Sequence, residues 1–247
     1  MIWGELKVLN RLNFLLNSGE KLAIVGPSGS GKSTILKILA GLILPSEGEL
    51  KIFGKPQEYL RLDQIEPPDV RLVFQNPALL GSLTIEENVG FILERNKNLP
   101  RQLIKEMVSE CLEEVGLYNI SHKLPSEISG GMQKRVSFAR ALIGEKKKNN
   151  TDKPLLLFDE PTAGLDPIAS TRIEDLINKT NNKVQGSSIV VSHVLSTIER
   201  TSNRVLILYG GKFRWEGSIS EFRSSRDPFV IQFREGRLDG PMQPKET

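Results

Sequence analysis

Residues 21–34, KLAIVGPSGSGKST, constrain the fold and chemistry of this chain more than any other stretch. Residues Lys21–Val25, which are apolar after the lysine, predict a short buried strand, and Lys32–Ala40 predicts a helix. Between them, GPSGSGKS has the spacing of a phosphate-binding loop, in which glycines let successive N–H groups point at phosphate oxygens. The helix aims the positive end of its dipole at the same anion. A Gly/Ser-rich turn without a ligand is the alternative, but the flanking strand and helix favour a nucleotide site.

Two side chains at the end of this loop suit a nucleotide bound with Mg²⁺. Lys32 supplies a mobile positive charge for the β- and γ-phosphates. The hydroxyl of Ser33 suits a Mg²⁺ ion that keeps most of its waters. The loop therefore predicts a site for a nucleoside triphosphate and its metal ion.

The composition is that of an ordinary globular protein, and it excludes several classes of function. A formal net charge of +3 gives no strong case for binding nucleic acid. The single cysteine, Cys111, rules out an internal disulfide and fits a reducing compartment. No run approaches 18 apolar residues, and the N-terminus lacks the features of a signal peptide. We therefore expect a soluble protein that stays where it is made.

The order of the predicted elements indicates an α/β core interrupted by helices. The apolar runs Val70–Phe74, 154–158 and Ser187–Val191 are typical of buried parallel strands. From the capping box that begins at Thr84, the pattern becomes helical. We therefore predict that residues 77–143 form a helical block inserted into the core.

Several chemically active residues directly follow these strands. Ligands of open α/β sheets bind outside the carboxyl ends of the strands, so Lys32, Asp159, Glu160 and His193 are expected to converge. Asp159 then holds Mg²⁺ together with Ser33, and Glu160 orients or deprotonates the attacking water. Solvent-facing loop carboxylates are the alternative for the acidic pair. For His193, the residues alone leave a structural role and a γ-phosphate contact equally open.

Two further features have both an ordinary and a functional interpretation. Ser129-Gly130-Gly131 opens a helix that runs through Ile143 and makes a second exposed anion-binding terminus. One active site does not need it, whereas two sites in a head-to-tail pair of subunits do. Trp3 is by default a surface or core aromatic, but its ring could also stack on adenine.

Taken in order, these motifs resemble the ATPase subunits of ATP-binding cassette (ABC) transporters over almost the whole chain. The resemblance implies a P-loop NTPase core with a mostly parallel sheet, an N-terminal antiparallel β part and the inserted helical subdomain. It implies ATP and Mg²⁺ as cofactors, with Gly26–Thr34 as the Walker A loop and Leu155–Asp159 as the Walker B strand. The implied nucleotide-binding residues are Trp3, Gly26, Pro27, Ser28, Gly29, Ser30, Gly31, Lys32, Ser33, Thr34, Ser129, Gly130, Gly131 and Asp166. The implied catalytic residues are Glu160, His193 and Gln75, and the implied metal ligands are Ser33, Gln75 and Asp159.

The signature motif narrows the resemblance. Met132 stands where Gln is usual, and Ile128 where Leu is usual. SGGM followed by basic residues resembles the Mla-type lipid transporter ATPases, which work with mammalian-cell-entry (MCE) domain proteins, and their plastid relatives. This implies a homodimer closed around ATP, an integral membrane permease contacted by the helical block and Gln75, an MCE-domain partner and no nucleic acid. It also implies a peripheral position on the cytoplasmic face of the inner membrane, or on the stromal side in a plastid.

We therefore predict an ATPase that drives a permease moving phospholipid or a related lipid between membranes. Import of an amino acid or another small solute is the alternative within transport. A soluble ABC ATPase acting on DNA or the ribosome is a third hypothesis. It is disfavoured because the chain has neither sustained heptads nor a second phosphate loop.

The two ends of the chain raise separate expectations. The strand that precedes the aromatic residue in the family is missing before Trp3, so we expect either a start codon assigned late or an unpaired sheet edge. We predict an ATPase domain at 1–226 and a C-terminal extension at 227–247. The extension could be frayed, but four apolar residues within 229–233 favour docking, and we expect the partner chain rather than the chain's own core as the surface. The charged segment 145–150 is predicted to be a surface loop.

Overall fold

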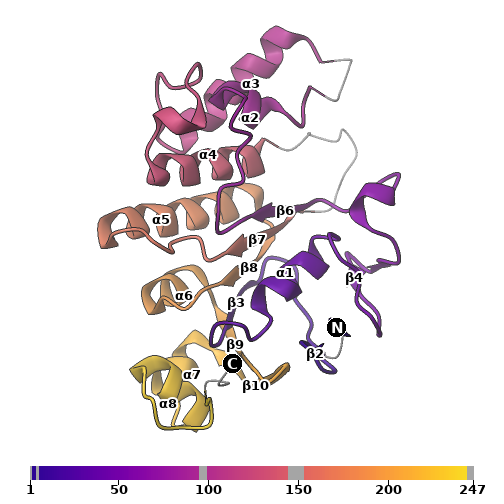
Figure 1. The fold of residues 1–247 in the computed structure, drawn as a ribbon, viewed down its shortest axis with the longest axis vertical. Helices are drawn as coiled ribbons and strands as arrows, with labels where there is room; N and C mark the ends of the chain where they lie inside the picture. Colours follow the sequence, from indigo (N-terminus) through magenta and orange to yellow (C-terminus); the bar gives the residue numbers. More distant parts are fainter. Residues whose placement is uncertain (1, 4–5, 95–98, 144–152, 244–247) are drawn as a thin grey trace.

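The computed structural model describes residues 2–3, 6–94, 99–143 and 153–243. Within them, six strands form one sheet in the order β10-β9-β3-β8-β7-β6 (Figure 1). All neighbouring strands are parallel except β9 and β10, which form an antiparallel pair. This arrangement confirms the predicted mostly parallel sheet. The predicted surface loop at 145–150 lies outside the residues that the structure describes. The strands are β3 (Lys21–Val25), β6 (Val70–Val73), β7 (Leu155–Asp159), β8 (Ser187–Val191), β9 (Arg204–Tyr209) and β10 (Lys212–Ser218).

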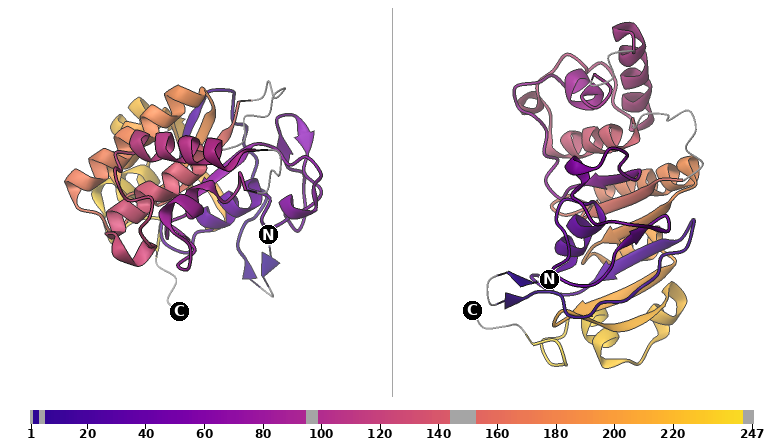
Figure 2. Two further views of the ribbon diagram at one scale, coloured as in Figure 1. Left: turned by 90° about the horizontal axis from the view of Figure 1, so that it is seen from above. Right: turned by 90° about the vertical axis from the view of Figure 1, so that its right-hand side faces the viewer.

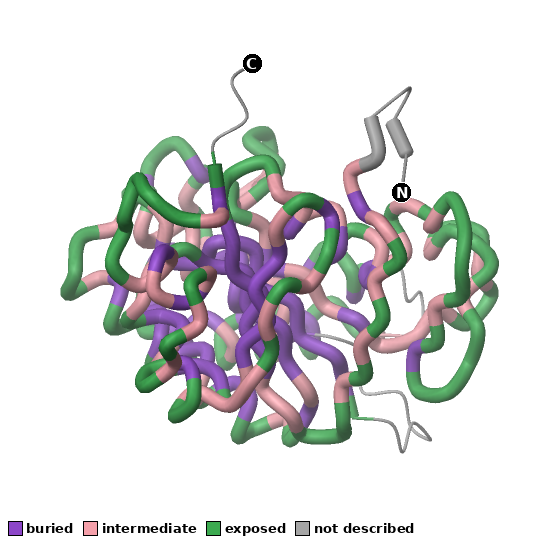
Figure 3. The backbone as a smooth tube through the Cα atoms, turned by 90° about the horizontal axis from the view of Figure 1, so that it is seen from below, coloured by how far each residue is buried: buried purple, intermediate pink, exposed green. Residues whose placement is uncertain are grey.

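Helices cover both faces of this sheet. α1 (Lys32–Leu39) packs on the face that carries Leu22 and Ile24. α5 (Pro167–Val184) and α6 (Leu195–Thr201) pack on the opposite face. Because side chains alternate between two covered faces, the central strands are apolar at almost every position. Figure 3 shows the buried residues gathered along these strands.

The predicted helical insertion lies between β6 and β7. It consists of α2 (Ile85–Gly90), α3 (Arg101–Glu114), the short η2 (Pro125–Glu127) and α4 (Gly130–Leu142). The capping box is present: the hydroxyl of Thr84 accepts from the N–H of Glu87, and the Glu87 carboxylate accepts from the N–H of Thr84 at 2.7 Å. In Figure 1 this block lies at one end of the sheet, and the C-terminal helices lie at the other.

The N-terminal antiparallel part consists of two short, separate pairs (Figure 2). The first pair is β1 (Ile2–Trp3) with β2 (Leu6–Lys7), and the second is β4 (Lys51–Ile52) with β5 (Lys55–Pro56). Residues 49–53 alternate like one longer strand, but φ is 51° at Phe53 and 76° at Gly54. Two consecutive positive φ angles are those of a tight hairpin turn, so β4 ends before Phe53. A 3₁₀ turn, η1 (Arg61–Asp63), follows before β6.

The C-terminal residues form α7 (Ile219–Ser224) and α8 (Pro228–Glu235). Val230 is fully buried against the chain's own core, and Phe229 and Phe233 pack on the same cluster. The preference for a partner chain is therefore wrong for these side chains, because β9 and α7 already supply an apolar surface. Docking itself is confirmed, while the domain boundary at 226 stays a prediction.

A side-chain amide holds the last described residues on α8. The Gln232 amide donates to the carbonyl of Met242 at 2.9 Å and accepts from the Met242 N–H at 2.7 Å, as a neighbouring strand would. Tyr209 completes the attachment, since its hydroxyl donates to the carbonyl of Gln243 at 3.0 Å. Gln232 and Met242 are both buried, so this contact excludes water.

We expect Gln232→Leu to lower the free energy of unfolding by about 1–3 kcal/mol, because it leaves both buried backbone groups of Met242 unpaired. Gln243→Leu is the matched control: among the described residues its exposed side chain bonds only to a loop carbonyl, and its loss should cost less than about 0.5 kcal/mol. Urea unfolding of the full chain measures both. Equal stability of the two variants would contradict the role given to Gln232.

Candidate nucleotide-binding site

The loop between β3 and α1 has a backbone that only glycine permits at two positions. Gly26 has φ of 149°, and a Cβ there would lie 2.2 Å from the carbonyl oxygen of Leu208. Gly31 has φ of 101°, and a Cβ would lie 2.7 Å from the side chain of Leu9. Gly31 is also the N-cap of α1 and provides no side chain to bond the first N–H groups of that helix. The helix start is therefore shaped to receive an anion.

The polar side chains of the loop suit a phosphate group. The Ser30 hydroxyl is buried and has no hydrogen-bond partner within the described residues. The ammonium of Lys32 donates to the carbonyls of Gly26 at 2.8 Å and Pro27 at 2.9 Å. Burial lowers the pKa of Lys32, while the nearby carboxylates of Glu160 and Asp159 oppose that shift. An unpaired hydroxyl and a buried cation both fit phosphate oxygens.

Ser33 and Asp159 meet at the predicted metal position. The Ser33 hydroxyl donates to Oδ1 of Asp159 at 2.9 Å, although 126 residues separate them. Burial raises the pKa of Asp159, and the hydrogen bond from Ser33 acts in the opposite direction. These are the hard oxygen donors that Mg²⁺ prefers. Within the part of the chain that the structure describes, no group of three or more His, Cys, Asp or Glu could hold the ion, so a cation here would also need ligands of other kinds, such as phosphate and water oxygens.

Glu160 and His193 form the polar pair next to this position. Nδ1 of His193 donates to Oε2 of Glu160 at 2.9 Å. Glu160 has φ of 45°, an unusual backbone conformation for a residue with a side chain, and its N–H donates to the carbonyl of Val191. Such strain persists only where neighbouring structure enforces it, and it is common at functional sites. The catalytic roles of both residues stay predictions, but the expected convergence is present.

Gln75 is the remaining residue predicted to bind the metal ion. It closely follows the strand β6, is exposed, and makes no hydrogen bond to Ser33 or Asp159 within the described residues. It lines a hollow of about 470 Å³ together with Gly130, Gly131 and Ala163. Its metal and catalytic roles stay predictions.

Two of the residues predicted to bind nucleotide, Ser129 and Asp166, are helix caps. Ser129 caps α4, and its hydroxyl accepts from the N–H of Met132 at 3.3 Å. Asp166 caps α5 and accepts from the N–H groups of Ile168 and Ala169. The bond from Ala169 is the main reason why the pKa of Asp166 is lowered. Neither cap bonds to residues 26–34 in the described part of the chain.

Trp3 lies in β1, but its side chain is outside what the structure describes.

Lys134 is a site residue that sequence reasoning missed. It extends from α4 to the turn after Glu160, where its ammonium donates to the carbonyl of Pro161 at 3.3 Å and also to that of Ala163. Burial lowers the pKa of Lys134, and the negative charge of Glu160 partly offsets the effect. The sequence does show a basic residue within the first turns of this helix. Which residue of the helix faces Glu160 depends on how the helix packs.

The sequence around this site matches a known protein family. The model for the ABC transporter family matches residues 9–163. The chain belongs to the ABC transporter family. This match and the relatives below confirm the predicted P-loop fold and the ATPase class.

The chain is similar to several known members of the family. It is 46% identical to protein trigalactosyldiacylglycerol 3, chloroplastic, of Arabidopsis thaliana, over 98% of this chain and 73% of the relative. It is 36% identical to MlaF of Haemophilus influenzae, an intermembrane phospholipid transport system ATP-binding protein, over 97% of this chain and 89% of the relative. Among solved structures, a dimeric post-hydrolysis state of the ATP-binding cassette MJ0796 with ADP and Pi matches at a TM-score of 0.75 and 31% identity, covering 86% of this chain and 90% of that one.

We expect Gly26→Ala to destabilise the chain by about 1–3 kcal/mol more than Gly29→Ala, because its Cβ would strike backbone that cannot move away. Gly29 is the matched control: it lies in the same loop with φ of 74°, but nothing lies within 4 Å of the position that its Cβ would take. Urea unfolding and binding of Mg·ATP measure the difference. If both variants unfold and bind alike, the close approach of Gly26 to Leu208 is not a constraint on the loop.

Proposed function

We propose that this chain is the ATP-hydrolysing subunit of a transporter that moves phospholipid or a related lipid between membranes. The observation that carries the ATPase part is the meeting of the phosphate loop with Asp159, Glu160 and His193 at one edge of the sheet. Two relatives support the proposed lipid substrate: the Arabidopsis protein is named after trigalactosyldiacylglycerol, a lipid, and MlaF is named for intermembrane phospholipid transport. Small-solute import and action on DNA or the ribosome are not favoured.

The residues divide the hydrolysis of ATP into three tasks. The loop N–H groups, Lys32 and the start of α1 bind the phosphates and orient them. Ser33 and Asp159 provide the protein oxygens for Mg²⁺, which when bound neutralises charge on the β- and γ-phosphates. The Glu160 carboxylate accepts a proton from the attacking water, and His193 holds that carboxylate in place through Nδ1.

A second copy of the chain completes the site in this proposal. Ser129 and Gly130 are exposed at the start of α4, and they are not bonded to the chain's own phosphate loop within the described residues. A helix start that is open to solvent can receive the nucleotide of another chain. The dimeric cassette with ADP and Pi supports such an arrangement.

The transport partners are part of the same proposal. The helical block exposes Phe91, Ile92 and Leu103, and Gln75 lies beside that block, so this end of the chain is proposed to contact an integral membrane permease. None of the described helices combines the length and apolar character needed to cross a membrane. An MCE-domain protein is proposed as a further partner. The proposed location is the cytoplasmic face of the inner membrane, or the stromal side of a plastid envelope.

We expect Glu160→Gln to keep ATP binding and to lower turnover by roughly 10²–10⁴-fold, because the amide cannot accept the proton of water. Lys32→Ala is the comparison variant and should weaken binding itself, since it removes the buried cation. Nucleotide titration and phosphate release measure the two effects separately. Turnover near wild type in Glu160→Gln would remove Glu160 from the mechanism.

The lipid assignment is tested with the chain in complex with its co-purified permease in vesicles. Fluorescent phospholipid should move between donor and acceptor vesicles when ATP is added, and the movement should be lost in the Glu160→Gln complex. Radiolabelled amino acid and sulfate, offered to the same vesicles, should not accumulate. Accumulation of a solute without lipid movement would replace the lipid assignment by solute import.

A further inference from the structure

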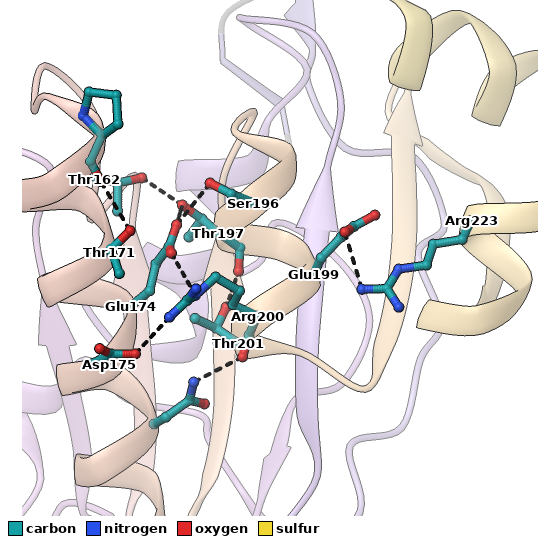
Figure 4. A network of polar contacts seen from close by, with 12 residues as sticks. Thr162, Thr171, Glu174, Asp175, Ser196, Thr197, Glu199, Arg200, Thr201 and Arg223 are labelled. Atoms are coloured by element: carbon teal, nitrogen blue, oxygen red, sulfur yellow. Dashed lines mark hydrogen bonds and ion pairs between the residues drawn. The ribbon is translucent and has the colours of Figure 1, made fainter.

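A buried carboxylate lies between α5 and α6 (Figure 4). Glu174 of α5 is 1% exposed. Its Oε1 accepts from the hydroxyls of Ser196 at 3.0 Å and Thr197 at 2.8 Å, and its Oε2 contacts Nε of Arg200 at 2.9 Å. All three donors come from α6, the helix that begins directly after the segment carrying His193.

The hydroxyl of Thr197 extends this contact to the turn after Glu160. Thr197 and Thr162 are both buried, and their hydroxyl oxygens lie 2.8 Å apart. A carboxylate only accepts hydrogen bonds, so Thr197 must give its proton to Glu174. The proton between the two threonines therefore belongs to Thr162, and the hydrogen bonds run in one direction from Thr162 through Thr197 to Glu174.

Thr162 is part of the turn that presents Glu160. The N–H of Ala163 donates to the carbonyl of Glu160 at 3.1 Å, and the N–H of Leu165 donates to that of Thr162 at 3.2 Å. Among the described residues, two pairs thus connect the turn after β7 with the chain that follows β8. One link is the Glu160–His193 pair, and the other is the Thr162–Thr197 contact.

We propose that Thr162, Thr197 and Glu174 are positioning residues for ATP hydrolysis, which fix the turn of Glu160 against the helix that follows His193. This inference rests on the roles of Glu160 and His193 in the proposed function. A buried carboxylate is a poor way to gain stability, because its desolvation offsets most of the attraction to its partners. A directional set of hydrogen bonds instead defines one relative position of two loops. An error of about 1 Å in such a position can lower a rate by up to about 100-fold.

Substitutions of Thr197 separate positioning from stability. We expect Thr197→Val, which keeps the shape and removes the hydroxyl, to lower kcat by about 10- to 100-fold. The KM for ATP should change by less than about twofold, because the phosphate loop is untouched. Thr197→Ser restores the hydroxyl and should restore kcat. Asp175→Asn is the control: it removes the negative charge of the exposed second partner of Arg200 but leaves every bond of Glu174 in place, and kcat should not change.

A double-mutant cycle tests whether the residues act as one series. Thr162→Val should also lower kcat, and Thr162→Val with Thr197→Val should be no slower than Thr197→Val alone. If the double variant instead shows the product of the two single losses in kcat, the residues do not act in series and the proposal is overturned. If Thr197→Val does not fold, kcat of Thr162→Val is compared with kcat of Thr162→Ser, which tests the hydroxyl at the first residue of the series.

The measurement is phosphate release by the full chain in its permease complex, with thermal unfolding of each variant alongside. The proposal is overturned if Thr197→Val and Thr162→Val lower only the melting temperature and turn over ATP like their Ser counterparts. In that case an inactive Glu160→Gln still leaves the proposed function intact. An active Glu160→Gln variant would instead remove the Glu160 role on which the inference rests.

Discussion

The parallel register of three buried strands is the constraint on which the rest of the site depends. Ile24 of β3 and Asp159 of β7 both pair with Val191 of β8. The residues that follow these three positions therefore leave the sheet at the same level, although the sequence separates them widely. Hydrogen bonding between backbones therefore brings the phosphate loop, Glu160 and His193 to the same edge of the sheet, where their side chains can make contact.

Burial then sets the electrostatics of this edge. It lowers the pKa of Lys32 and raises that of Asp159, which in each case favours the uncharged form. Each also lies near a group of opposite charge, and their attraction limits both shifts. The site thus keeps a cation and a carboxylate in a partly dry environment, where interactions with phosphate and Mg²⁺ are stronger than in water.

Much of this could be predicted from the sequence, because the informative signals are local. The spacing of glycines indicates the loop, apolar runs indicate the strands, and the Thr84 capping box predicts the start of α2 at the observed residue. The contacts of Lys134, Thr162 and Glu174 could not be predicted, since they depend on which side of a helix faces a neighbouring turn. The surface predicted for α8 was wrong for the same reason: an apolar pattern indicates burial but does not name the partner.

The structure separates two kinds of interaction by location. The faces of the sheet are held by apolar packing, which is strong but does not fix positions finely, since side chains of similar volume can replace one another. At the carboxyl edge, the turns are held by directional polar contacts: Lys134 to two carbonyls, His193 to Glu160, and Thr162 through Thr197 to Glu174. Each of these contacts requires a donor and an acceptor at a defined distance. Catalytic geometry therefore depends in part on residues outside the apolar packing of the sheet, so that a substitution among them can change catalysis more than stability.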